Sequence, residues 1–344
     1  MQMGDLASTI HALMAPGRGI LAADERQATI ARRFGSIGLG PTEENRRRYR
    51  QLLFTTPGVE EYISGVILFD ETIRQRAADG RTFVAILAER GIVPGIKVDA
   101  GAAPLAGAPG EVVTEGLDGL RDRLAAYRDL GARFAKWRAV ITIGDGRPSP
   151  YALDTNAHAL ARYAALCQEV GLVPIVEPEV LMDGAHSLAR CFEVTEATLE
   201  RVFTVLRAQR VMLEHLLLKP NMVVPGAASS ERPGVAEVAE ATVRCLRRTV
   251  PAAVPGVVFL SGGQDATLAT ERLNAMNALA LPHPWPLGFS FARALQEPAL
   301  AAWRGEPRNV EAGQRAFYHR ARCNGAARLG QYTTQMERQV ESPA

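Results

Sequence analysis

Eight short β-rich runs, separated by stretches with helical patterning, most limit how this chain can fold. They recur at intervals of about 30–47 residues along the 344-residue sequence. The runs are residues 17–25, 65–71, 95–99, 133–138, 173–179, 216–221, 256–263 and 287–293. Eight strands alternating with helices predict an α/β fold, a single (β/α)8 TIM barrel. A doubly wound sheet is the competing arrangement, because periodicity alone does not exclude it.

The helical stretches carry start signals and apolar faces. In residues 195–207, apolar side chains recur at i, i+3, i+4 and i+7 (Leu199, Val202, Phe203 and Leu206), which is typical of a helix with one buried face. Thr42 is a plausible N-cap, followed by Glu43 and Glu44 in a first turn.

The chain shows no linker rich in proline, glycine or serine, so we expect one domain over residues 1–344. Its barrel core covers about residues 17–307, preceded by a helix at about 5–14. A short helical tail covers about 308–344.

Composition excludes several classes of protein. A hydrophobic content of 47% is too high for a disordered chain, and a net charge of +2 gives no general attraction to nucleic acid or membrane. No apolar run reaches the roughly 18 residues that a bilayer span needs, and the first ten residues lack the pattern of a signal peptide. The four cysteines are far apart, with no CxxC pair. We therefore expect a soluble, cytoplasmic protein.

Lysine is rare in this sequence. Lysine and arginine together number 39, but the only lysines are Lys97, Lys136 and Lys219. Arginine serves at least as well in ion pairs, but it does not readily lose its proton to become an amine nucleophile. Each remaining lysine therefore calls for its own explanation.

Charged residues gather toward the ends of the runs. Lys97 with Asp99, Lys136 with Arg138, and Glu177 with Glu179 are each two residues apart, so each pair shares one face of a strand. We expect these faces to point into the barrel mouth, where barrel enzymes have their active sites. Every predicted strand end carries a polar or charged group once five further residues are included: Asp24, Asp70, Glu71, Ser261 and Arg293. The apolar neighbours are expected on the opposite face, under the helices: Ile96, Val98, Phe134 and Val176.

Lys219 follows a continuous apolar run and precedes a proline. Burial of a lone amine disfavours its charged form, which is the condition for a Schiff-base lysine. The glutamate pair could transfer the protons that carbinolamine formation and dehydration require. For Lys97 and Lys136, an internal ion pair with Asp99 or a glutamate is an equally good interpretation.

The turn Ser261–Gln264 could direct backbone N–H groups at a phosphate, because phosphate sites recur after strands 7 and 8 of barrels. Arg293 is placed to share that anion. The six histidines are scattered, none paired at ligand spacing within a strand-end motif, so we expect no catalytic metal. The arginines at 46–48 and 50 follow Glu43 and Glu44 and are expected on a solvated, salt-bridged helix face.

At these residues the sequence resembles class I fructose-bisphosphate aldolase, the metal-free Schiff-base type. The matching segments include GRGILAADE, GVILFDET, GIKVD, FAKWR, VPIVEPE, LLKPNMV, FLSGGQ and FSFARALQ, in order from about residue 10 to 330. The resemblance implies reversible cleavage of fructose 1,6-bisphosphate to dihydroxyacetone phosphate and glyceraldehyde 3-phosphate.

The resemblance also implies roles for individual residues. Lys219 matches the lysine that forms the Schiff base, Glu177 the acid/base of carbinolamine dehydration, and Glu179 its supporting partner. Asp24 matches the residue that takes the hydroxyl proton as the C3–C4 bond breaks, and Lys136 the lysine that orients this cluster. The phosphate and substrate ligands would be Ser261, Gly262, Arg293, Lys97, Arg138, Arg33, Thr29 and Arg26. No cofactor or metal is implied, and the family suggests a homotetramer.

Three departures from the family pattern stand out. Arg26 and Thr29 stand where serines are usual, and Ala292 replaces a glycine. The sequence stops at ESPA without the terminal tyrosine that assists proton exchange in the animal and plant enzymes, so we expect that role to be vacant or filled otherwise. No role is assigned to Asp70 and Glu71.

Three other functions are compared with this one. Another Schiff-base barrel such as a transaldolase fits less well, because it lacks a doubled phosphate apparatus. The same apparatus does not decide against an aldolase that prefers a monophosphate such as fructose 1-phosphate. In a non-catalytic barrel, we expect at least one of Lys219, Glu177 and Asp24 to have been substituted, and all three are present.

Overall fold

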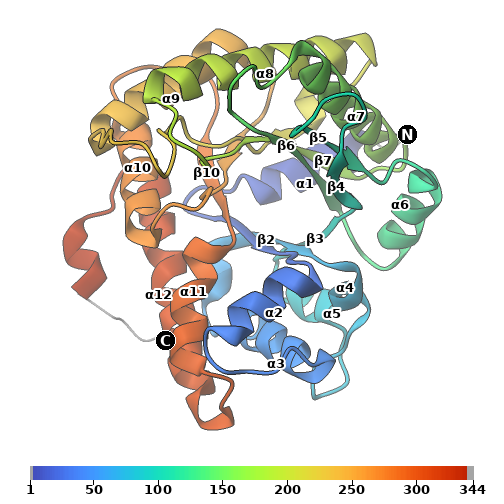
Figure 1. The fold of residues 1–344 in the computed structure, drawn as a ribbon. Coiled ribbons are helices and arrows are strands. Elements are labelled where there is room, and N and C mark those ends of the chain that lie inside the picture. The colour runs from blue at the N-terminus through green and yellow to red at the C-terminus, as the bar shows by residue number, and fades with distance from the viewer. Residues whose placement is uncertain (1–2, 339–344) are drawn as a thin grey trace.

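A closed barrel of eight parallel strands forms the centre of the protein in a computed structural model that describes residues 3–338 (Figure 1). The strand order around the barrel is β1-β10-β9-β8-β7-β6-β3-β2. The strands are β1 (Gly19–Ala23), β2 (Ile63–Leu68), β3 (Val93–Lys97), β6 (Phe134–Ile141), β7 (Val173–Val180), β8 (Leu217–Leu218), β9 (Val257–Phe259) and β10 (Leu287–Phe291). Each overlaps one of the eight predicted runs, so the barrel is confirmed and the doubly wound sheet is wrong.

The barrel is accompanied by helices, of which α1 lies at one end and the others lie outside the strands (Figure 1). They are α1 (Met3–Leu13), α2 (Gln27–Gly35), α3 (Glu43–Phe54), α4 (Asp70–Arg74), α5 (Phe83–Glu89), α6 (Leu120–Asp129), α7 (Pro150–Glu169), α8 (Leu188–Ala208), α9 (Val235–Thr249), α10 (Ala266–Ala278), α11 (Arg293–Trp303) and α12 (Val310–Arg328). Short 3-10 turns are η1 (Val59–Glu61), η2 (Leu213–His215), η3 (Pro307–Asn309) and η4 (Thr334–Arg338).

The local signals at two helices are confirmed. The Thr42 hydroxyl accepts a hydrogen bond from the Asn45 N–H at 3.2 Å, as an N-cap of α3 should. The four apolar residues predicted on one face of α8 are all buried. None of the helices within residues 3–338 is long and apolar enough to cross a membrane.

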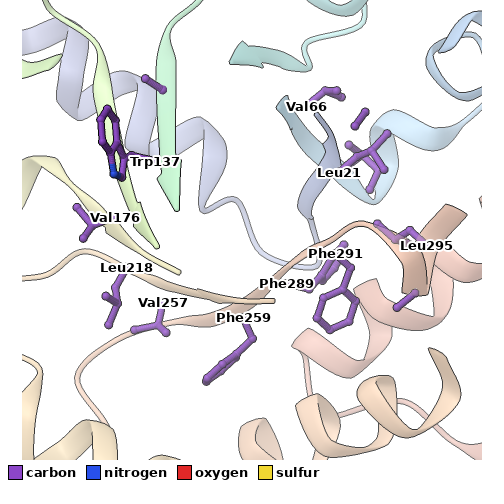
Figure 2. Packing of buried hydrophobic residues seen from close by; sticks show 14 of the residues in the cluster. Leu21, Val66, Trp137, Val176, Leu218, Val257, Phe259, Phe289, Phe291 and Leu295 are labelled. Carbon is purple, nitrogen blue, oxygen red and sulfur yellow. The ribbon is translucent and has the colours of Figure 1, made fainter. Parts of the chain in front are cut away.

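Side chains alternate between the two faces of the barrel strands. Trp137, Val176, Leu218 and Phe259 point outward and pack under the helices (Figure 2). Phe134 does not join them, so its predicted outward position is wrong. It packs inside the barrel with Ile67. The reason is the period of two, because Phe134 shares its face with Lys136 and Arg138.

The barrel interior is apolar at the end where the strands begin. Inward-facing residues such as Ile175 and Val258 form a cluster with Leu6, Ile10 and Leu13 of α1. Burying these side chains contributes roughly 1.5–3 kcal/mol each. The amino-terminal helix therefore closes one end of the barrel and leaves polar groups to the other end.

Two features differ from the sequence-based expectation. An antiparallel hairpin of β4 (Gly101–Pro104) and β5 (Val112–Glu115) lies between β3 and β6, where no strands were predicted. The Arg50 side chain is not on a solvated face. It is buried and forms an ion pair with Glu25, with Arg50 Nη2 2.5 Å from Glu25 Oε2.

The helical tail is confirmed over η3, α12 and η4. The expectation about the terminal ESPA residues lies outside the described part of the chain.

Candidate active site

Four buried charged side chains from four strands meet at the carboxyl end of the barrel. Asp24 directly follows β1, Lys136 lies on β6, Glu177 on β7, and Lys219 directly follows β8. Lys136 Nζ lies 2.6 Å from Asp24 Oδ2 and 3.2 Å from Glu177 Oε2. Lys219 Nζ lies 3.0 Å from Glu177 Oε1. The four predicted residues therefore form one continuous chain of alternating charge, which we call the lysine cluster.

The strand geometry explains why these residues converge. Asp24 lies two residues beyond inward-facing Ala22, and Glu177 and Lys219 lie two residues beyond inward-facing Ile175 and Leu217. All four therefore point to the barrel axis, above the apolar layer. The Lys219 N–H donates to Val176 O at 2.8 Å, which continues the β7–β8 pairing to the lysine itself.

The charges within the cluster determine its ionisation. Burial alone would raise the pKa of Asp24, but the ammonium groups of Lys136 and Lys219 outweigh it and lower that pKa from 3.8 to about 2. The same balance lowers the pKa of Glu177. Burial would lower the pKa of Lys136, but Asp24 and Glu177 outweigh burial and raise it. Lys136 is therefore a fixed cation that holds both carboxylates in their ionised form.

Glu177 is placed to move protons. Its carboxylate contacts both lysines, yet among the described residues its Oε2 atom has no well-aligned hydrogen bond. A buried carboxylate oxygen with this freedom can accept a proton from a neighbouring amine and return it to a reacting oxygen. The arrangement is therefore suited to acid/base work on a group bound at Lys219.

Two further ion pairs border the cluster. Lys97 Nζ lies 2.6 Å from Asp99 Oδ1, which is the pairing that the sequence left open for Lys97. Burial lowers the pKa of Lys97, although Asp99 opposes this effect. Arg138 donates from Nε to Glu179 Oε2 on the neighbouring strand. These pairs extend the charged surface of the barrel mouth across β3, β6 and β7.

The predicted phosphate turn lies where two helices begin. Gly262 and Gly263 adopt φ values of 56° and 90°, which other residues rarely tolerate. The turn leads into α10, and Arg293 is the first residue of α11. Arg293 Nη2 donates to Gly263 O at 2.5 Å, so Arg293 lies against this turn. Ser261 is buried beside it. Two helix amino termini and an arginine around one glycine turn form a suitable environment for an anion.

The residues predicted at the other end of the substrate are spread around the first strand. Arg26 is exposed, and its Nη2 lies 4.0 Å from Asp99 Oδ1. Its guanidinium packs against Gly101, where any Cβ would clash with it. Thr29 is half-buried on α2. Arg33, also on α2, forms an ion pair with Glu25. Arg26 therefore lies beside the Lys97–Asp99 pair, while Arg33 is held by a carboxylate.

Glu25 is a buried group that the sequence reasoning missed. It lies next to Asp24 but faces the other way, where it pairs with Arg33 and Arg50 and accepts a hydrogen bond of 2.7 Å from Gln296 Nε2. The alternation of strand side chains could have indicated this position, because adjacent residues point to opposite faces and Asp24 points into the barrel. Its pKa is lowered because the arginines outweigh the effect of burial.

Asp70 and Glu71, which had no assigned role, have structural partners. Arg74 Nη2 lies 2.9 Å from Asp70 Oδ1, and Arg46 Nη2 lies 2.5 Å from Glu71 Oε2.

The profile of one protein family, described as "Glycolytic: Fructose-bisphosphate aldolase class-I", matches residues 5–343. The chain belongs to the class I fructose-bisphosphate aldolase family. That family is metal-independent and uses a lysine Schiff base. The lysine cluster contains buried amines and carboxylates, which are the kinds of group that such chemistry uses.

Individual aldolases are similar over nearly the whole chain. A protein of Xylella fastidiosa named "Probable fructose-bisphosphate aldolase class 1" is 57% identical over 96% of this chain and 99% of its own length. "Fructose-bisphosphate aldolase 4, cytosolic" of Arabidopsis thaliana is 55% identical over 92% of this chain and 81% of its own. The solved structure of fructose-bisphosphate aldolase from Plasmodium falciparum superposes with a TM-score of 0.94 at 48% identity, covering 96% of this chain and 95% of that one.

Proposed function

We propose that this aldolase reversibly cleaves fructose 1,6-bisphosphate through an imine on Lys219. The observation that carries the assignment is the position of Glu177, whose carboxylate lies 3.0 Å from Lys219 Nζ and 3.2 Å from Lys136 Nζ. A carboxylate in this position can exchange protons with the nucleophilic amine, while the permanently charged lysine on its other side holds it in position.

Imine formation uses Lys219 and Glu177. The ammonium group of Lys219 gives one proton to Glu177, and the resulting amine attacks the ketone carbon. A second proton then passes from the attacking nitrogen to the carbonyl oxygen, which gives the neutral carbinolamine. Glu177 then protonates the departing hydroxyl group, which leaves as water. The product is an iminium ion that withdraws electrons from the neighbouring carbon.

Carbon–carbon cleavage uses Asp24. Its carboxylate takes the proton of the C4 hydroxyl as the C3–C4 bond breaks, and the bonding electrons move into the iminium to give an enamine. Glyceraldehyde 3-phosphate leaves first. Protonation and hydrolysis of the enamine release dihydroxyacetone phosphate. Lys136 supports this step because it holds Asp24 ionised.

The substrate phosphates are assigned to two regions. Ser261, Gly262 and Arg293 hold the phosphate near the ketone, because the glycine turn and two helix amino termini converge there. Lys97, Arg138, Arg33, Thr29 and Arg26 line the approach of the distal phosphate, and Glu179 supports Arg138 through its ion pair.

Trapping tests the assignment of Lys219. Borohydride reduction with dihydroxyacetone phosphate should add the reduced triose to Lys219, as read by peptide mass mapping. Lys219→Arg should abolish turnover although it keeps the charge. An adduct mapped to Lys136 or Lys97 would contradict the assignment.

A preference for fructose 1-phosphate is the second candidate. The observation behind it is that three cations assigned to the distal phosphate, Lys97, Arg33 and Arg138, are each already paired with a carboxylate. A coupled assay that compares kcat/KM for the two sugar phosphates distinguishes the two candidate functions. Cleavage of fructose 1,6-bisphosphate should be the faster reaction.

This cleavage should also survive exhaustive chelation. An activity lost with EDTA and restored by zinc, in a protein that gives no triose adduct on Lys219 after borohydride reduction, would overturn the Schiff-base mechanism.

Membership of the family supports a cytoplasmic homotetramer built from single-domain subunits, without nucleic-acid or membrane partners. Light scattering coupled to size exclusion tests the oligomer, and a monomer at micromolar concentration would contradict it.

A further inference from the structure

Three potential metal ligands come together outside the lysine cluster, where the carboxy-terminal segment packs on α12. His319 and Cys323 are one helical turn apart, so they share a face of α12. Glu337 lies on η4. The pair lies on a helix with i, i+4 spacing, so it is not among the strand-end residues to which the expectation about metal ligands applied.

The separations of the donor atoms fit a single small ion. His319 Nε2 lies 3.8 Å from Cys323 Sγ and 3.6 Å from Glu337 Oε2, and the three donor atoms lie within 4.8 Å of one another. Tetrahedral zinc with ordinary bond lengths needs about 3.6 Å between nitrogen and sulfur and about 3.4 Å between nitrogen and oxygen. Shifts of a few tenths of an ångström would therefore bring the two distances from His319 to the values that one ion needs. The sulfur of Cys323 and the carboxylate of Glu337, which lie within 4.8 Å of each other, would approach to about 3.6 Å.

Burial prepares the two helix residues for this role. His319 and Cys323 are 7% and 0% exposed. Burial lowers the pKa of His319 despite the nearby Glu337, which favours the neutral ring that a metal ligand needs. Burial raises the pKa of the Cys323 thiol to about 11, so without a metal it stays protonated.

Glu337 is already oriented toward the pair. Arg320 Nη1 donates to both of its oxygens at 2.6 Å, and Tyr332 Oη donates to Oε1 at 2.8 Å. Oε2 can turn to an ion while Oε1 keeps its two donors. Groups that orient a ligating carboxylate in this way commonly support metal sites.

We propose that His319, Cys323 and Glu337 bind a divalent transition-metal ion of the zinc class, with water as the fourth ligand. Sulfur, imidazole and carboxylate donors together favour zinc or cobalt over magnesium or calcium. On binding, the thiol proton of Cys323 passes to solvent and a metal–sulfur bond forms. The ion ties η4 to α12 and takes no part in aldol cleavage.

Cobalt titration of the full-length protein, freed of metal beforehand, tests this site. Co²⁺ should produce a near-ultraviolet sulfur-to-cobalt charge-transfer band, and added Zn²⁺ should displace Co²⁺ and remove this band. Cys323→Ser should abolish the band. His319→Asn and Glu337→Gln should each weaken Co²⁺ binding by about 10-fold or more, at least the effect of disturbing a group that orients a ligand.

The matched control is Cys245→Ser, which removes another buried thiol, on α9, and should keep the band. Far-ultraviolet circular dichroism and turnover of each variant report whether it has folded. No band in the parent protein, or a band that survives Cys323→Ser, would overturn the site. Binding unaffected by Glu337→Gln would overturn the tie between η4 and α12.

Discussion

At the scale of single residues, the ionised state of Asp24 depends on its neighbours. Its pKa is lowered to about 2 in the folded protein, so the unfolded chain takes up a proton first as the pH falls. The stabilisation by the carboxylate is therefore present above about pH 4 and is lost as the pH falls toward about 2. A shift from 3.8 to about 2 corresponds to roughly 2 kcal/mol.

In the parent protein, the free energy of unfolding should fall by roughly 2 kcal/mol more than in Asp24→Asn as the pH is lowered from about 4 toward 2, because the amide of the variant does not titrate. Urea unfolding measured between pH 5 and pH 2.5 checks it. Asp154→Asn is the control, because solvent screens its exposed ion pair with Arg201, and it should have the smaller effect. An equal effect of both substitutions would mean that Lys136 does not control Asp24.

Arg26 gives a second prediction at this scale. A guanidinium beside the Lys97–Asp99 pair can offer phosphate a bidentate, charge-assisted bond. Arg26→Ser should raise KM for fructose 1,6-bisphosphate about 10-fold or more, using 1.5–3 kcal/mol for a charged hydrogen bond. Cleavage of fructose 1-phosphate, which lacks the distal phosphate, should change little. Equal effects on both substrates would mean that Arg26 acts through structure.

The sequence identified these residues better than it identified their partners. The scarcity of lysine and the i, i+2 spacing marked Lys136 and Glu177 as inward-facing groups. The contact between Glu177 and Lys219 joins residues on two strands, and it depends on the stagger between β7 and β8. The partners of Glu25 come from α2, α3 and α11, and no local pattern indicates how these helices pack.

At the scale of elements, the start of α10 connects helix stability to the phosphate turn. The Asp265 carboxylate accepts hydrogen bonds from the N–H groups of Thr267 and Leu268 at 2.9 and 3.1 Å. Asp265→Ala should lower the free energy of unfolding by about 1 kcal/mol. It should also raise KM, because the preceding glycine turn loses its anchor.

The control is Thr42→Ala, which removes the corresponding cap from α3. It should cost similar stability with unchanged KM. Urea unfolding and steady-state kinetics on both variants check the pair. A KM shift of the same size in both variants would show that the cap of α10 has no special connection to the phosphate site.

Strands were predictable where burial on both faces produces continuous apolar runs, as in β1 and β9. The β4–β5 hairpin was not, because its strands have four residues each and are partly exposed. Its sequence therefore carries little of the apolar signal that identifies barrel strands.

At the scale of the whole molecule, the barrel separates stability from chemistry. The end closed by α1 is apolar, and the opposite end holds the lysine cluster and the glycine turn. The carboxy-terminal segment is tied elsewhere. Its η4 turn reaches α12 through the ion pair of Glu337 with Arg320. Sequence reasoning predicted a helical tail but not this contact, because it depends on how the chain returns after α12.

Deleting the residues after 335 should therefore reduce stability more than catalysis. The described residues that are lost include Glu337, which holds buried Arg320, and Met336, which packs against the core. Removing the partner of a buried charge costs roughly 3–5 kcal/mol, so the free energy of unfolding should fall by an amount of that order. Turnover should fall no more than about twofold, because neither residue contacts the lysine cluster.

Urea unfolding measures the loss of stability, steady-state cleavage measures turnover, and proton exchange of dihydroxyacetone phosphate measures protonation of the enamine. Glu337→Gln in the full-length chain separates the loss of the carboxylate from the loss of the segment. A large drop in triose proton exchange in the truncated protein, with Glu337→Gln unaffected, would show that the terminal segment takes part in protonating the enamine.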